Sequence, residues 1–263
     1  MKKILLAMTA IAAMTASASA ADLGARPYAK APALVPTPIM NWTGFYVFGG
    51  GGGGLWSADS NVVNPAGALT RDQRLGGNGW FGTVGAGYDW QFNDKWVLGI
   101  FGDGQFGDIS GSLNDSVFTG GAVEGREKLR TSYAAGARLG YLVAPNVLSY
   151  VNAGYSGSDW SGTTLSSLTP PFGAVGSTQS FSRSGWFIGG GVENNLDFFG
   201  IAAPGWFMKT EYRSAYYDRA TLPVSDGTPA LTGTAITFKP QVQTISTSLV
   251  YRFNWGGPVV AKY

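Results

Sequence analysis

The sequence predicts an all-β protein: an eight-stranded antiparallel β-barrel that spans a membrane. Three observations carry this prediction. Apolar and polar residues alternate with a period of two over segments of roughly ten or more residues, long enough for a tilted strand to cross a bilayer. Aromatic residues gather at the ends of these segments, as they do where strands leave the hydrocarbon. Short and long connections alternate along the chain, which is typical of membrane-spanning barrels.

The chain begins with a secretory signal peptide, predicted over residues 1–20. The first residues carry positive charge and are followed by an apolar run over residues 4–14. Small residues then match the pattern of a signal-peptide cleavage site between Ala20 and Ala21. Residues 21–40 are rich in Pro and Ala, which favours an extended periplasmic tether. We therefore expect the barrel domain to begin after this tether and to occupy residues 41–263.

Composition excludes several classes of function. Charged residues make up 13% of the chain, about half the usual share in soluble domains, whereas the apolar share of 44% argues against disorder. No apolar run of 18 residues follows the signal segment, so no transmembrane helix is predicted. Without Lys2 and Lys3, the 18 basic residues fall to 16 and balance the 16 acidic ones. Nucleic acid is therefore not expected as a partner.

The sequence contains no histidine and no cysteine. Their absence excludes Ser-His-Asp and Cys-His catalysis, the usual imidazole metal sites and disulfides. We expect no catalytic residue, no metal site and no cofactor.

The first expected strand covers residues 41–56 and contains six consecutive glycines, 49–54. A phosphate-binding loop is disfavoured because neither a Gly-Lys-Ser/Thr sequence nor a βαβ pattern accompanies the run. A barrel strand with close neighbour contacts fits the run better. The glycines leave open which face of this strand points inward.

Seven further strands are predicted from the same alternation. They cover residues 80–91, 96–106, 127–143, 147–158, 186–196, 206–214 and 241–253. Three short turns join them at residues 93–94, 144–146 and 197–205, on the periplasmic side. Four long extracellular loops are expected at the polar, Gly-, Ser- and Pro-rich residues 57–78, 109–126, 159–183 and 221–238.

The aromatic residues at the strand ends are the predicted interfacial residues. They are Trp80, Tyr88, Trp90, Trp96, Tyr141, Trp186, Trp206, Tyr251 and Phe253. A soluble β-sandwich also alternates, but its strands are usually about five or six residues long. In lipid an open sheet edge finds no hydrogen-bond partners, so we expect the first and last strands to pair.

Charged residues fall on the face opposite the apolar one, which predicts an interior lined by both signs of charge. The expected set is Asp89, Asp103, Lys128, Arg130, Arg138, Glu193, Lys209, Glu211, Arg213 and Arg252. An eight-stranded barrel is just wide enough for side chains to fill it, and buried charges need partners. We expect ion pairs that block wide flow; a narrow path for ions or small solutes is the alternative.

Two motifs resemble a known family. The segment WTGFYV at residues 42–47 begins the expected barrel, and YRF at residues 251–253 ends it. Together with the signal peptide and the tether, they resemble the outer-membrane immunogenic protein group of α-proteobacteria, often labelled the porin family. The resemblance implies an eight-stranded barrel in the cell outer membrane of a Gram-negative bacterium, exposed as a surface antigen. Tyr251 and Phe253 resemble a C-terminal assembly signal, with Phe253 or Tyr263 as its terminal aromatic.

The resemblance implies a structural, surface-exposed role rather than catalysis. Outer-membrane lipid, the barrel assembly machinery and peptidoglycan or other envelope components are the expected partners. A lipid-modifying enzyme is less favoured, because eight-stranded acylases and deacylases rely on a His base. Asp103 and Glu193 could act in acid–base chemistry, but pairing with arginine is the expected state of such carboxylates.

Overall fold

The computed structural model describes residues 41–63, 69–118, 121–225 and 231–253. The expected signal peptide with Ala20 and Ala21, the tether and Tyr263 lie outside these residues. Among the described residues, no helix is long and apolar enough to cross a membrane.

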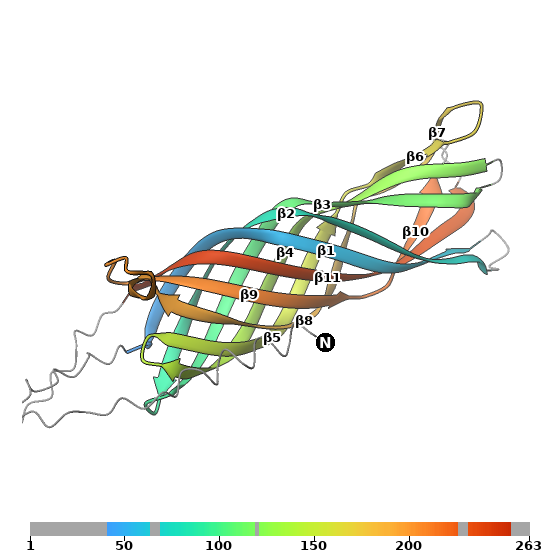
Figure 1. The fold of residues 1–263 in the computed structure, drawn as a ribbon. Coiled ribbons are helices and arrows are strands. Elements are labelled where there is room, and N and C mark those ends of the chain that lie inside the picture. The colour runs from blue at the N-terminus through green and yellow to red at the C-terminus, as the bar shows by residue number, and fades with distance from the viewer. Residues whose placement is uncertain (1–40, 64–68, 119–120, 226–230, 254–263) are drawn as a thin grey trace, which may run out of the picture. The chain divides into compact units, whose positions relative to one another are not determined.

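Eleven strands and one short 3-10 helix form the described part of the chain (Figure 1). They are β1 (Gly44–Val63), β2 (Leu69–Phe92), β3 (Trp96–Phe118), β4 (Gly121–Ala144), β5 (Val147–Trp160), β6 (Thr163–Ser167), β7 (Gly173–Thr178), β8 (Phe181–Asn195), η1 (Leu196–Phe199), β9 (Trp206–Tyr217), β10 (Ala220–Ser225) and β11 (Leu231–Phe253). Every pairing between these strands is antiparallel, so the prediction of an all-β antiparallel fold is confirmed.

The sheet closes into a ring because its first strand pairs with its last. The ring runs β1-β2-β3-β4-β5-β8-β9-β11 and returns to β1. The β1–β11 seam extends from the pair Phe45 and Phe253 to the pair Val63 and Ala235. Closure satisfies the backbone groups that an open edge would leave unpaired. We call the end with the β2–β3, β4–β5 and β8–β9 connections the turn end, and the opposite end the hairpin end.

The sheet continues at the hairpin end through different strands. There β6 pairs with β4 and β7, β7 meets β10 at Ser177 and Ser225, and β10 pairs with β11. The expectation of four long loops is therefore wrong over much of their length, because these residues are largely strand (Figure 1). Their Gly-, Ser- and Thr-rich composition resembles loop composition, but the backbone still finds ladder partners in the neighbouring strands.

The structure shows which glycines of the β1 run point into the ring. Alternation from the buried Phe48 and Trp56 turns Gly50 and Gly52 inward. An added Cβ would lie 2.1 Å from the Thr247 carbonyl oxygen at Gly50 and 2.0 Å from the Ile245 carbonyl oxygen at Gly52. Only glycine allows β1 to approach β11 this closely, so the inward glycines make the seam possible.

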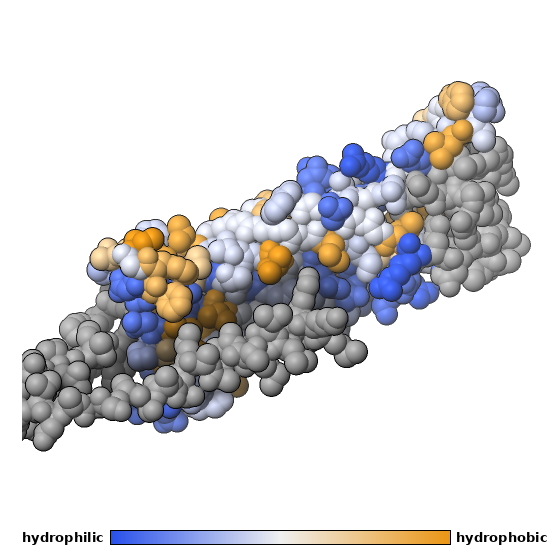
Figure 2. All heavy atoms as spheres, in the orientation of Figure 1, coloured by the Kyte–Doolittle hydropathy of each residue, from blue (hydrophilic) through white to orange (hydrophobic). Residues whose placement is uncertain are grey.

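The outer face of the ring is apolar and is bordered by aromatic side chains. The predicted interfacial aromatics all lie on this face, with Trp80 the most exposed at 79%. Ring contacts join neighbours near the turn end and again toward the hairpin end: Phe45–Tyr88, Trp96–Tyr141, Trp206–Tyr251, Trp186–Tyr216 and Tyr133–Tyr155. Figure 2 shows pale and orange residues over the middle of the visible face. This arrangement suits hydrocarbon around the ring and interfaces at its two borders.

Candidate functional site

Four charged side chains meet inside the ring near its turn end, and we call them the turn-end cluster: Asp89, Arg138, Glu193 and Arg252. They come from β2, β4, β8 and β11, which are alternate strands of the ring. Arg138 donates from Nε to Asp89 at 2.9 Å and from Nη1 to Glu193 at 3.0 Å. Arg252 pairs through Nη1 with Asp89 at 2.8 Å and donates from Nε to Glu193 at 2.8 Å. Each carboxylate therefore bridges both guanidinium groups, and all four residues are at most 3% exposed.

A second group lies deeper in the ring, and we call it the mid-barrel cluster: Asp103, Lys209, Glu211 and Arg213. Arg213 donates from Nη1 and Nη2 to the two Asp103 oxygens at 2.9 and 2.7 Å. Because β3 and β9 stand on opposite sides of the ring, this bidentate pair spans its interior. Glu211 accepts a hydrogen bond from Arg213 at 2.7 Å and another from the Tyr150 hydroxyl at 2.8 Å, and it lies 3.8 Å from Lys209 Nζ.

Aromatic rings line both clusters. The Arg138 guanidinium lies 4.4 Å from the centre of the Tyr46 ring, and the Arg213 guanidinium lies 4.6 Å from that of Phe187. Lys209 Nζ lies 3.3 Å from the centre of the Phe48 ring. These contacts stabilise cations in a place where water is scarce, and they fill the space between the ion pairs.

Apolar layers cover the clusters on both sides. At the turn end, Trp42 packs against Phe207 with ring centres 5.1 Å apart. Toward the hairpin end, Trp160 packs against Trp56 at 5.6 Å and Phe238 at 5.3 Å. The four residues Trp42, Phe207, Trp56 and Trp160 are each at most 1% exposed. The charged interior is thereby shielded from bulk water along the axis of the ring.

Each cluster contains two acids and two bases, so each is formally neutral. Burying a charge is costly unless it is paired and hydrogen-bonded, and here every carboxylate in the two clusters has at least one arginine partner. Carboxylates held in this way are poor acid–base catalysts, because arginine hydrogen bonds occupy their oxygens. Among the described residues, no group of His, Cys, Asp or Glu is arranged to hold a metal ion. The charges of each cluster are therefore paired with one another inside the ring.

Two of the expected interior residues lie elsewhere. Lys128 and Arg130 are on the outer face, where Lys128 Nζ pairs with Asp108 at 2.8 Å and Arg130 is exposed. The reason is a register shift between Leu129 and Thr131, where β4 has one residue more than β5. Such a bulge exchanges inner and outer faces for every residue beyond it.

The same bulge turns Glu127 inward, a residue that uninterrupted alternation assigns to the outer face. Glu127 lies at the hairpin end, beyond the aromatic residues Trp80 and Tyr133, and is 1% exposed. Its Oε2 accepts a hydrogen bond from the Thr163 hydroxyl at 2.9 Å, and its Oε1 has no hydrogen-bond partner among the described residues. Burial raises the pKa of the Glu127 carboxyl to about 7. No signal in the sequence marks this residue, because bulges leave no simple pattern.

Comparison with known proteins gives matches over most of the chain. The family model described as "Outer membrane protein beta-barrel domain" matches residues 4–253. The 31 kDa outer-membrane immunogenic protein of Brucella melitensis biotype 1 is 28% identical over 223 residues, which are 81% of this chain and 85% of that protein.

Among solved structures, the outer membrane protein OprG from Pseudomonas aeruginosa matches with a TM-score of 0.46 and 10% identity, covering 81% of this chain and 98% of that one. Neisserial surface protein A matches with a TM-score of 0.36 and 14% identity, covering 80% and 98%.

Proposed function

The chain belongs to the outer membrane protein β-barrel domain family, and from this premise we propose that it is a structural, surface-exposed barrel whose interior is closed to flow. Its place is the cell outer membrane. The observation that carries the proposal is the pair of neutral ion-pair clusters, which join strands across the ring instead of leaving a water-filled path. Porins of larger strand number differ in this respect, since their lumen holds water.

In this proposal, the eight strands of the ring span the bilayer. The turn end faces the periplasm, and the hairpin end faces the outside, where it is available for interactions. The aromatic border near the turn end and the border toward the hairpin end then mark the two interfaces. Outer-membrane lipid surrounds the ring, the barrel assembly machinery inserts it, and peptidoglycan or other envelope components lie near its periplasmic end.

Tight packing of the interior favours a closed barrel over a narrow channel. The clusters, the aromatic rings around them and the apolar layers above and below occupy successive levels of the same lumen. An ion would have to separate the Asp103–Arg213 pair, which is buried and joined by two hydrogen bonds. Enzymatic function has no support from the two clusters, whose carboxylates are bound to arginine.

Planar-bilayer recording tests this proposal directly. Purified monomer should insert and show no large, stable conductance steps at neutral pH. A matched variant, Asp103→Ala with Arg213→Ala, removes the pair that spans the lumen without changing the net charge, and it should conduct more. Large, stable steps from the unmodified monomer would overturn the closed-barrel proposal.

Labelling of whole cells tests the orientation. A cysteine placed at exposed Phe172, between β6 and β7, should react with an impermeant maleimide in intact cells, whereas one at Phe198 in η1 should react only after the envelope is opened. The opposite result would reverse the proposed orientation.

A further inference from the structure

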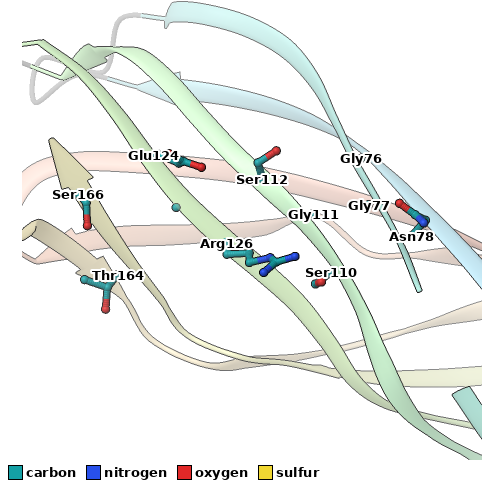
Figure 3. Close-up of a pocket in the computed structure, with 11 residues that line it drawn as sticks. Gly76, Gly77, Asn78, Ser110, Gly111, Ser112, Glu124, Arg126, Thr164 and Ser166 are labelled. Carbon is teal, nitrogen blue, oxygen red and sulfur yellow. The ribbon is translucent and has the colours of Figure 1, made fainter. Parts of the chain in front are cut away.

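A cavity of about 590 Å³ opens on the outer face at the hairpin end, formed by β2, β3, β4 and β6 (Figure 3). Gly76 leaves the outer face of β2 without a side chain at this hollow. Gly111 lies on the inner face, opposite Glu127, and an added Cβ there would lie 2.2 Å from the Gly76 carbonyl oxygen, so β2 and β3 approach closely. The packing of β2 against β3 therefore requires glycine at position 111, and backbone forms the floor of the cavity on the outer face. The volume is in the range of small-molecule sites.

Polar side chains surround this glycine floor. Asn78 comes from β2, Ser112 from β3, and Thr164 and Ser166 from β6, and all four are exposed. Figure 3 shows Arg126 extending from β4 toward β3. Arg126 shares the cavity with the carboxylate of Glu124, and no ion pair joins Arg126 to another residue in the described part of the chain.

A basic row continues from the cavity along the outward face of β4. Below Arg126 come Lys128 and Arg130, the two residues that the β4 bulge turns outward. Lys128 is partly neutralised by Asp108, whereas Arg130 has no ion pair among the described residues. Arginine presents a planar fork of donors that matches phosphate oxygens. Arg126 is the cation of the row that lines the cavity, while Lys128 and Arg130 add positive charge farther along β4.

An apolar trough of about 380 Å³ adjoins the cavity on the other side of β2. Its floor is Gly53 and its walls include Leu55, Trp80 and Ile245, which face outward in the lipid-facing band. Asn78 lines both hollows, so the polar cavity and the apolar trough meet at this residue. A soluble sugar has no apolar group to bury in the trough, whereas an acyl chain matches the apolar side chains that line it.

We propose that the two hollows form one binding site for a phosphorylated glycolipid. Arg126 holds the phosphate, the rest of the basic row attracts it electrostatically, and the amide of Asn78 with the hydroxyls of β3 and β6 binds the sugar. The glycine floor lets a sugar ring approach the backbone, and the trough around Gly53 holds an acyl chain. This inference rests on the proposed function, because such lipids meet the hairpin end only if that end faces the outer leaflet.

The test is a titration of full-length protein, refolded in zwitterionic detergent, with lipid A, read by native mass spectrometry. Arg126→Gln should weaken lipid A binding about tenfold, the loss expected for one charge-assisted hydrogen bond. Lys95→Gln removes the same charge at the turn end and should leave binding unchanged. Gly53→Leu fills the trough, where the nearest atoms to an added Cβ are 3.8 Å away, and should also weaken lipid A binding.

The same titration with the free phosphorylated disaccharide separates a lipid from a soluble ligand. The disaccharide should bind more weakly than lipid A, and Gly53→Leu should not affect it. Equal binding of dephosphorylated lipid A, equal binding of phosphatidylglycerol, or unchanged binding in Arg126→Gln would each overturn the proposal. Heat-dependent gel mobility of every variant shows that the barrel has formed, and whole-cell labelling tests the orientation separately, so failure of the site is distinguishable from failure of the proposed function.

Discussion

Replacing Glu193 by glutamine removes one negative charge from the turn-end cluster and keeps the shape of the side chain. In the structure Glu193 Oε1 accepts from Arg252 and Oε2 accepts from Arg138. After the change, two guanidinium groups face the single carboxylate of Asp89 in a part of the ring that is closed to water. The variant therefore carries an uncompensated buried positive charge.

The expected cost follows from that charge. Removing one partner of a buried ion pair typically lowers the free energy of unfolding by about 3–5 kcal/mol. A second change, Arg252→Met, restores neutrality and leaves the Arg138–Asp89 pair intact. We therefore expect the double variant Glu193→Gln with Arg252→Met to recover about 2 kcal/mol or more relative to the single variant, a coupling typical of residues in one network.

The assay is equilibrium unfolding in urea of protein refolded into lipid vesicles, followed by tryptophan fluorescence and by heat-dependent gel mobility. The comparison needs the single variants, the double variant and the unmodified chain under one set of conditions. A Glu193→Gln loss below about 0.5 kcal/mol, or additive losses in the double variant, would show that water already solvates the cluster. In that event the interior would not be the dry plug inferred from the geometry.

Three further predictions address the hairpin end, the seam and assembly. The pKa of Glu127 is raised to about 7 in the folded protein, so the folded state binds the proton of this carboxyl more tightly than the unfolded state does. As pH rises from about 4.5 to 7, the free energy of unfolding should therefore fall by about 3 kcal/mol. Glu127→Gln should remove that part of the pH dependence in urea titrations; an identical slope would contradict it. Gly52→Ala should prevent heat-modifiable folding because its Cβ meets the Ile245 carbonyl oxygen, whereas Gly49→Ala, with 3.9 Å of space, should fold; equal folding yields would contradict the seam geometry. A chain ending at Phe253 should still insert into membranes, because Phe253 already pairs with Phe45 in the seam; loss of insertion would place the assembly signal in residues 254–263.

The bulge in β4 shows where a sequence pattern stops being sufficient. Alternation is a local property: it places Arg138 and Ser132 on the same face of β4 without reference to any other strand. Beyond the register shift between Leu129 and Thr131, the residues that alternation assigns to the inner face lie on the outer face and the reverse. Lys128 therefore faces outward and Glu127 inward. The bulge depends on how β4 fits against β5, and that fit involves residues far apart in the chain.

The hairpin end illustrates a different limit. Residues 163–167 and 173–178 have the composition of a loop, yet they form β6 and β7. Their strands exist because β4 and β10 offer backbone partners on both sides. Composition describes side chains, whereas a ladder needs only backbone groups in the right place.

By itself the sequence determined the all-β class, the outward position of the interfacial aromatics and the exclusion of histidine and cysteine chemistry. These properties follow from residue types and from a two-residue period, both of which are readable along a single strand. Tertiary structure alone decided which charges meet. Asp103 and Arg213 are 110 residues apart and touch only because ring closure sets β3 opposite β9. The stagger between paired strands determines which residues of different strands lie at the same height in the ring. That stagger is a property of the closed sheet rather than of any one segment.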